Sequence, residues 1–255
     1  MAGPEQGWHG DRSLPSSPGR CAIPALHRPR NDPRQYDDLA AEWWKPRGAF
    51  AALHWLAAAR AKMIPAPTRP GALLLDVACG GGLLAPLVSG YRHVGVDIGE
   101  QATKVAREHG VETVRGDVTA LPIRDEVADV VVAGEILEHV PDIEPLIAEV
   151  ARVLKPGGTV VVDTLADTWI AKFLLVTLAE RIPGVAPPGI HDPDFFVDPA
   201  RLQQVCDKYG IALRLRGLRP SIPDALAWQL RLRADVRMLP TRNTDVVYQG
   251  VGTKR

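Results

Sequence analysis

Acidic residues stand where several apolar runs of this sequence end. The run at residues 72–82, ALLLDVACGGG, carries Asp76 and closes on three glycines; later apolar runs end in Asp97 and Glu135, and Asp117 lies between them. A buried strand that leads into a glycine-rich turn is where a parallel α/β sheet presents its backbone to a nucleotide-like ligand. Three glycines alone indicate little, but this order of acids predicts such a ligand site.

The acid before the glycines narrows the kind of ligand. Asp97 follows the turn at the distance where a carboxylate accepts hydrogen bonds from ribose hydroxyls, which suits NAD and other adenosine cofactors. The turn itself is not G-x-G-x-x-G, and the Asp76 carboxylate would repel a pyrophosphate while suiting a cationic ligand. The pattern therefore favours a sulfonium cofactor, with an NAD-dependent dehydrogenase as the weaker alternative.

Glu135, Glu138 and His139 form a second group of chemically capable residues. Spacings of three and four residues place their side chains on one face if the segment begins a helix. Two carboxylates and an imidazole can hold a divalent cation, or His139 can act alone as a general base. In the third, structural interpretation Glu135 caps the helix, Glu138 is solvated and His139 packs against a loop.

Composition limits the class of protein. The 255 residues are 46% hydrophobic and 24% charged, enough for a sizeable core, and we expect one domain with extensions. A formal net charge of zero offers no general attraction for nucleic acid. Three widely spaced cysteines favour neither a disulfide framework nor a zinc finger, so a cytoplasmic location fits best, and no apolar run is long enough to span a bilayer.

The chain that must position these groups alternates between apolar runs and helical patterns. This alternation predicts right-handed βαβ crossovers in an α/β fold with a mostly parallel sheet and helices on both faces. We expect a seven-stranded sheet. The expected strands are residues 73–77, 93–97, 112–115, 128–133, 159–163, 211–217 and 246–252, and the expected helices are 83–89, 100–109, 143–154 and 199–209.

Regions outside this alternation divide the chain further. Residues 1–30 are rich in Pro, Gly, Ser, Arg and His and are expected to be a disordered extension. Residues 31–70 are expected to form a helical cap with aromatic side chains, followed by a proline-rich linker. The main domain then covers residues 71–255, with insertions at about 164–197 and 219–243.

These residues together resemble the class I S-adenosylmethionine-dependent methyltransferases, whose first motif is (E/D)-x-G-x-G-x-G. The motif reads Asp76-x-Ala78-x-Gly80-x-Gly82 here, with alanine for the first glycine. The resemblance implies a Rossmann-like fold with S-adenosylmethionine as cofactor. It also implies that Asp97 holds the ribose hydroxyls, Asp117 the adenine amino group and the backbone around Gly134 the methionine end, with Ile98 and Val118 as further cofactor contacts.

A closer resemblance is to UbiG-type ubiquinone-biosynthesis O-methyltransferases. It is carried by the segments at residues 41–44 (AEWW), 53–54 (LH), 134–142 (GEILEHVPD), 154–158 (LKPGG) and 191–192 (HD). It implies that Arg60 reaches the cofactor carboxylate and that Glu135, Glu138 and His139 hold magnesium against a catechol oxygen. A metal there would lower the pKa of the phenol and orient the oxyanion toward the methyl group.

The expected function is therefore O-methylation of a phenolic or catechol hydroxyl on a small, lipophilic aromatic. Trp44, His54, Trp169 and His191 are candidate substrate contacts, although large aromatics are more often core residues. The apolar segment at 165–180 could cover the substrate, rest on a membrane surface or simply pack in the core. The alternatives are a secondary-metabolite O-, N- or C-methyltransferase and a non-catalytic binding protein. The protein is expected to be a monomer or a homodimer.

Overall fold

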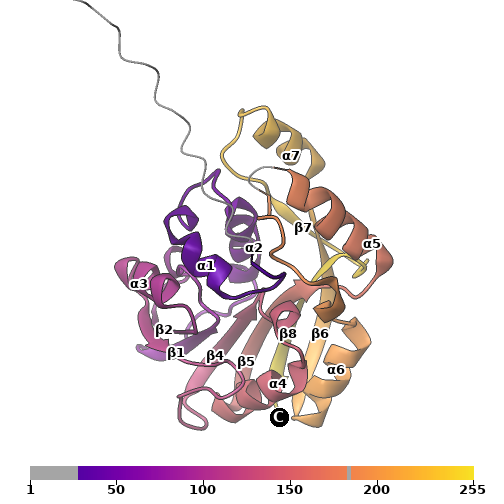
Figure 1. The fold of residues 1–255 in the computed structure, drawn as a ribbon. Coiled ribbons are helices and arrows are strands. Elements are labelled where there is room, and N and C mark those ends of the chain that lie inside the picture. The colour runs from indigo at the N-terminus through magenta and orange to yellow at the C-terminus, as the bar shows by residue number, and fades with distance from the viewer. Residues whose placement is uncertain (1–27, 183–184) are drawn as a thin grey trace, which may run out of the picture.

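The computed structural model describes residues 28–182 and 185–255, which build one eight-stranded sheet in the order β3-β2-β1-β4-β5-β8-β6-β7 (Figure 1). The first five of these strands run parallel, β8 is antiparallel to β5 and β6, and β7 is antiparallel to β6. The strands are β1 (Ala72–Val77), β2 (Tyr91–Asp97), β3 (Glu112–Arg115), β4 (Ala128–Gly134), β5 (Leu154–Leu165), β6 (Ile211–Pro220), β7 (Met238–Thr241) and β8 (Val247–Lys254).

Alternating burial along the strands gives the sheet a hydrophobic core on each face. Leu75 of β1 belongs to the large core that includes Leu146 of α4 and Leu202 of α6, whereas the preceding Leu74 packs with Leu84 in a separate core on the other face. Figure 1 shows α4 and α6 in front of the sheet. The helices are α1 (Arg34–Asp38), α2 (Ala51–Ala61), α3 (Glu100–Glu108), α4 (Ile143–Val153), α5 (Trp169–Ala171), α6 (Pro199–Lys208) and α7 (Ile222–Gln229).

The sheet differs from the prediction in its eighth strand. The expected insertion at 219–243 holds α7 and then β7, which pairs with the end of β6 and extends the edge of the sheet. The expected insertion at 164–197 starts later than predicted, because β5 continues to Leu165. The helix of this insertion begins with α5, continues as a π-helical segment, Lys172–Leu178, and ends in a 3-10 turn, Ala179–Arg181. The helix expected at 83–89 is only a 3-10 turn, Ala85–Leu87, because Val88 already adopts extended backbone.

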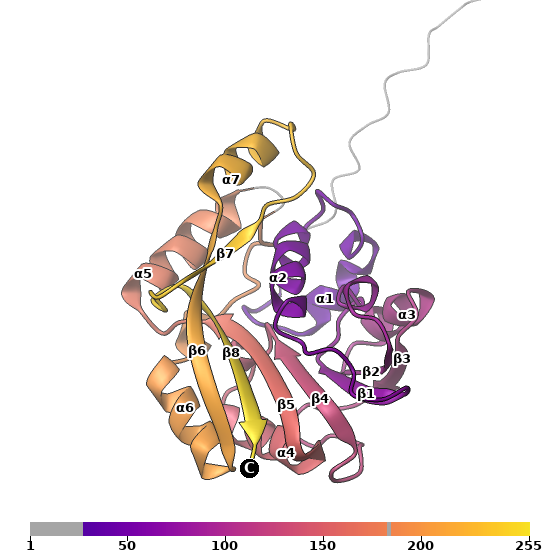
Figure 2. The ribbon, with the colours of Figure 1, turned by 180° about the vertical axis from the view of Figure 1, so that it is seen from behind.

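The N-terminal cap lies above the carboxyl ends of the parallel strands, and α2 stands beside the ends of β4 and β5 (Figure 2). Asp37 of α1 fixes the cap to the main domain, because its carboxylate accepts hydrogen bonds from the backbone N–H groups of Glu100, Gln101 and Ala102. Gly99, the N-cap residue of α3, has no side chain to do this, so a residue distant in sequence supplies the cap.

The predicted disordered extension at 1–30 lies outside the described residues except for its last three. Of these, Arg28 pairs with Asp38, and Arg30 pairs with Glu180 at 3.1 Å. The part of the chain that the structure describes contains no helix long and apolar enough to cross a membrane.

Candidate active site

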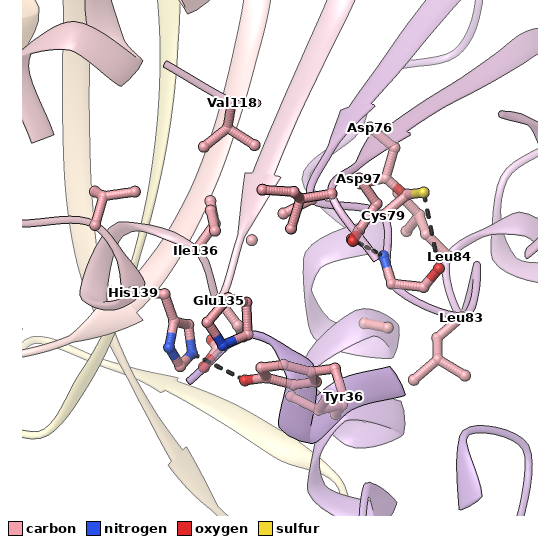
Figure 3. Close-up of a pocket in the computed structure, with 18 of the residues that line it drawn as sticks. Tyr36, Asp76, Cys79, Leu83, Leu84, Asp97, Val118, Glu135, Ile136 and His139 are labelled. Carbon is pink, nitrogen blue, oxygen red and sulfur yellow. Dashed lines mark hydrogen bonds between the residues drawn. The ribbon is translucent and has the colours of Figure 1, made fainter. Parts of the chain in front are cut away.

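A cavity of 350 Å³ opens where the chain order of the sheet reverses, between β1 and β4 (Figure 3). Ligands of open α/β sheets bind at this switch point, because the loops after the two strands diverge there. All the predicted cofactor-binding residues except Gly82 line it: Arg60, Asp76, Ala78, Gly80, Asp97, Ile98, Asp117, Val118 and Gly134.

The Asp97 carboxylate organises the glycine turn. Its Oδ2 accepts a hydrogen bond from the backbone N–H of Gly80 and its Oδ1 accepts one from Gly99, both at 2.8 Å. Burial raises the pKa of Asp97. Each carboxylate oxygen has a second lone pair, so the group can still accept hydrogen bonds from a ligand. Ala78 adopts φ 59°, the left-handed conformation that glycine would supply more readily.

Trp43 of the cap covers the glycine turn. A Cβ at Gly80 would lie 2.4 Å from Cη2 of Trp43, and a Cβ at Gly81 would lie 2.5 Å from its Cγ. Gly82 adopts φ 76° and packs against Ala106 of α3, outside the cavity. The glycines of this motif therefore let the cap approach the sheet as well as leaving room for a ligand.

Arg60 of α2 forms a buried ion pair with Asp163 of β5. Its Nε lies 3.0 and 2.9 Å from the two carboxylate oxygens, and its Nη2 lies 2.8 Å from Oδ1. Gln249 of β8 donates a further hydrogen bond to Asp163 at 3.4 Å. The guanidinium rests on Gly134, where a Cβ would lie 2.0 Å from its Cζ. Arg60 is thus held at the cavity by β4, β5 and β8 together.

Glu135 and Glu138 are neighbouring carboxyls that shift each other's pKa, Glu135 half-buried in the cavity wall and Glu138 fully buried. Burial, followed by the charges of Glu138 and Asp163, raises the pKa of Glu135 well above its usual value. Burial also raises the pKa of Glu138 to about 7, although Thr164 donates a hydrogen bond to its carboxylate at 2.8 Å. Glu135 lines the cavity and adopts φ 56°, a strained conformation for this residue type.

His139 is held neutral by the cap. Its Nδ1 contacts Oδ1 of Asn31, whose amide nitrogen donates to the His139 carbonyl at 3.2 Å. Because that amide oxygen only accepts, Nδ1 carries the proton and Nε2 accepts from the Tyr36 hydroxyl at 3.0 Å. Burial, with a smaller effect from His191, lowers the pKa of His139 to about 3. Both ring nitrogens are therefore occupied.

The predicted metal ligands do not form a metal site in this arrangement. Glu135 and Glu138 each have one buried oxygen without a hydrogen-bond partner in the structure. His139, however, faces Tyr36 and Asn31, and residues 28–182 and 185–255 contain no group of three His, Cys, Asp or Glu side chains able to hold an ion. Glu138 is fully buried and lies behind the cavity rather than in its lining.

A second cavity, of 380 Å³, adjoins the first. The two share Tyr36, Leu53 and Glu135 in their walls, and the rest of the second lining is mostly apolar. Of the predicted substrate contacts, only His191 lines it. Its ring stacks on that of His139 with centroids 5.8 Å apart, and burial lowers its pKa to about 4.

The other predicted substrate contacts lie outside both linings. Trp44 donates from Nε1 to the Gly81 carbonyl at 2.9 Å, and His54 contacts the Trp43 carbonyl at 2.7 Å. Trp44 therefore joins the cap to the glycine turn, and His54 joins two parts of the cap. Trp169, on the insertion after β5, is 76% exposed, and Phe173 and Leu178 of the same insertion are also exposed. Membrane contact by this segment stays a prediction.

Residues that the sequence analysis did not single out complete the site. Asn31 and Tyr36 lie more than a hundred positions from His139, and no periodic pattern connects them with it. Asp163 gave a usable signal, because a carboxylate inside the apolar run TVVVDTL has to find a buried partner.

Comparisons with known proteins identify the family of this chain. Residues 75–162 match the family model described as a methyltransferase domain. Curated proteins named ubiquinone biosynthesis O-methyltransferase are similar over much of the chain. That of Thiobacillus denitrificans is 37% identical over 69% of this chain and 81% of its own length, and that of Vibrio atlanticus is 34% identical over 68% and 78%. A solved Thermotoga maritima methyltransferase, titled a possible histamine N-methyltransferase, shares the fold with a TM-score of 0.61 at 19% identity, covering 88% of this chain and 97% of its own.

The fold, the glycine turn and the acids at the strand ends define a class I S-adenosylmethionine-dependent methyltransferase. Within that class, the chain belongs to the family of the ubiquinone biosynthesis O-methyltransferases. The expected Rossmann-like fold and family are confirmed.

Replacing one partner of the Arg60–Asp163 pair should cost more than replacing both. Asp163→Leu leaves a buried, unpaired guanidinium, so we expect the free energy of unfolding to fall by about 3–5 kcal/mol. Arg60→Met combined with Asp163→Leu removes both charges and should recover much of that loss. Urea unfolding of the wild type, Asp163→Leu, Arg60→Met and the double variant measures the coupling. A double variant that loses the sum of two single losses would contradict a paired role.

Acid should destabilise the protein through His139. The pKa of His139 is about 3 in the folded state and 6.5 in the unfolded state. Above pH 6.5 the imidazole is neutral in both states and folding is not penalised; as pH falls from 6.5 toward 3, only the unfolded chain takes up the proton, so the free energy of unfolding decreases. Between pH 7 and pH 5 this loss is about 2 kcal/mol. His139→Gln should show a shallower fall in unfolding free energy over this range than the wild type, whereas the exposed control His109→Gln should match the wild type. Equal slopes for His139→Gln and the wild type would refute the assignment.

Proposed function

We propose that this protein transfers the methyl group of S-adenosylmethionine to a phenolic or catechol hydroxyl of a small, lipophilic aromatic acceptor. The observation that carries the proposal is Glu135, a half-buried carboxyl in the wall shared by the two cavities. One cavity has the cofactor residues and the other is mostly apolar, so a proton-accepting group lies where two ligands would meet. The names of the relatives, which act in ubiquinone biosynthesis, support an acceptor of this kind.

The cofactor would lie in the first cavity, and its sulfonium supplies the methyl group. In the proposed arrangement Asp97 accepts hydrogen bonds from the ribose hydroxyls and Asp117 from the adenine amino group. Thr119 donates from its backbone N–H and its hydroxyl to the Asp117 carboxylate, at 2.8 and 2.7 Å, and lowers its pKa, so Asp117 stays ionised as an acceptor. Arg60, already fixed by Asp163, pairs with the carboxylate of the amino-acid end.

Glu135 and Glu138 would take up the proton of the acceptor hydroxyl. The raised pKa of Glu135 keeps one proton on the pair, and at a pH above the Glu138 value of about 7 the pair has room for a second. Glu135 contacts the acceptor in this scheme and Glu138 acts through it. His139 is the weaker candidate for a base, because Nε2 already accepts from Tyr36. Alignment of the two ligands supplies most of the rate, on the order of 7–11 kcal/mol.

The alternatives differ in what this carboxyl pair would do. A nitrogen acceptor needs a base only for its final proton, and a carbon acceptor needs an activated ring. A non-catalytic binding protein needs neither the pair nor a second cavity. The half-buried, strained position of Glu135 therefore favours an oxygen acceptor over both alternatives.

Two assays test the proposed function. Calorimetry should detect binding of S-adenosylmethionine and not of NAD, and a panel of catechols and hydroxyquinones should include at least one that gains a methyl group on oxygen. Binding without any transfer would favour a non-catalytic protein, and transfer to nitrogen or carbon alone would favour the other alternative. The magnesium prediction is checked by adding EDTA, since turnover that EDTA leaves unchanged would end it.

The pH profile should report the carboxyl pair. We expect kcat/KM to fall as pH drops below about 7, because the second protonation of Glu135 and Glu138 removes the proton acceptor. Glu138→Gln should abolish this dependence and lower kcat by about 10²–10⁴-fold. The surface variant Glu144→Gln serves as the matched control and should keep the wild-type profile. A profile that survives in Glu138→Gln would assign the proton to another group.

A further inference from the structure

The second cavity is polar at one end and apolar at the other. The polar end holds Tyr36 and Glu135, which also line the first cavity, and His191, which stacks on His139. Trp55 and Met238 also line this cavity, with Arg219 of β6 as a charged neighbour. Met238 lies on β7, which β5, β8 and β6 separate from β4, the strand that leads into Glu135. A ligand that spans the cavity would therefore place a polar group beside the methyl donor and an apolar group away from it.

The apolar end is built by segments far apart in the sequence. Trp55 of α2 packs edge-to-face on Trp228 of α7 with ring centroids 5.1 Å apart, and Val185 and Met238 pack against this cluster. Met238 comes from β7, the strand that the sequence did not predict, and β7 lies beside α2 (Figure 2). Both insertions thus contribute to one wall of the cavity.

We propose that Trp55, Val185 and Met238 determine which apolar substituent of the methyl acceptor this enzyme takes. This rests on the proposed function for the identity of the reacting hydroxyl. The hydroxyl of the acceptor lies at Glu135, the aromatic ring lies between Leu53 and His191, and a hydrocarbon substituent extends toward Met238. Burial of each methylene in such a lining is worth about 0.8 kcal/mol, or roughly fourfold in binding. Affinity should therefore rise with the length of the substituent.

The probes are catechol and 4-pentylcatechol, titrated into the full-length enzyme saturated with S-adenosylhomocysteine. The wild type should bind 4-pentylcatechol at least tenfold more tightly than catechol. Met238→Trp fills the apolar end and should remove this preference while changing the affinity for catechol by less than about twofold. Met238→Leu, which nearly conserves volume, should behave as the wild type.

Ala186→Phe narrows the same cavity from the other insertion. It serves as the test variant if Met238→Trp unfolds at a lower temperature than the wild type. Binding of equal strength for both catechols by the wild type would overturn the proposal, and so would an unchanged preference in the narrowed variants. The experiment measures binding and not methyl transfer. Failure of methyl transfer to catechols would therefore count against the proposed function, while the binding preference would still test this proposal.

Discussion

The ion pair between Arg60 and Asp163 is the interaction on which the rest of the site depends. The carboxyl ends of β1, β4 and β5 bring Asp76, Glu135, Glu138 and Asp163 close together in a region that excludes water. Arg60 supplies positive charge within this group and tends to lower the pKa of Glu135. Because the guanidinium comes from α2 and the carboxylate from β5, the same contact also fixes the cap against the sheet.

The cap is part of the site and not only a cover. Tyr36 lines both cavities and donates a hydrogen bond to Nε2 of His139, while Asp37, the next residue, caps α3 close to Asp97. A shift of α1 would therefore change the cofactor cavity, the second cavity and the imidazole together. A helix of only five residues thus contributes to the walls of both cavities.

Residues at the ends of parallel strands could be predicted from sequence, because the topology alone brings those ends to one edge. Asp97, Asp117 and Glu135 were located in this way and line the cavity, whereas Gly134 was named through the family resemblance. The roles of Trp44 and His54 could not be predicted, since sequence spacing does not fix the direction of a side chain within a cap. The contact of Asn31 with His139 and the wall formed by Met238 depend on tertiary packing between distant segments, for which a single sequence carries no periodic signal.

The packing of Trp43 on the glycine turn has a consequence for how this sequence can evolve. A side chain at position 80 or 81 collides with the indole, and a smaller residue at position 43 leaves a void above the turn. Either change made alone lowers stability. Positions 43, 80 and 81 are therefore epistatic, and substitutions at them have to occur together. Homologues that carry a bulkier residue in the turn are therefore expected to lack the tryptophan, and a variant library that randomises these positions one at a time would misjudge all three.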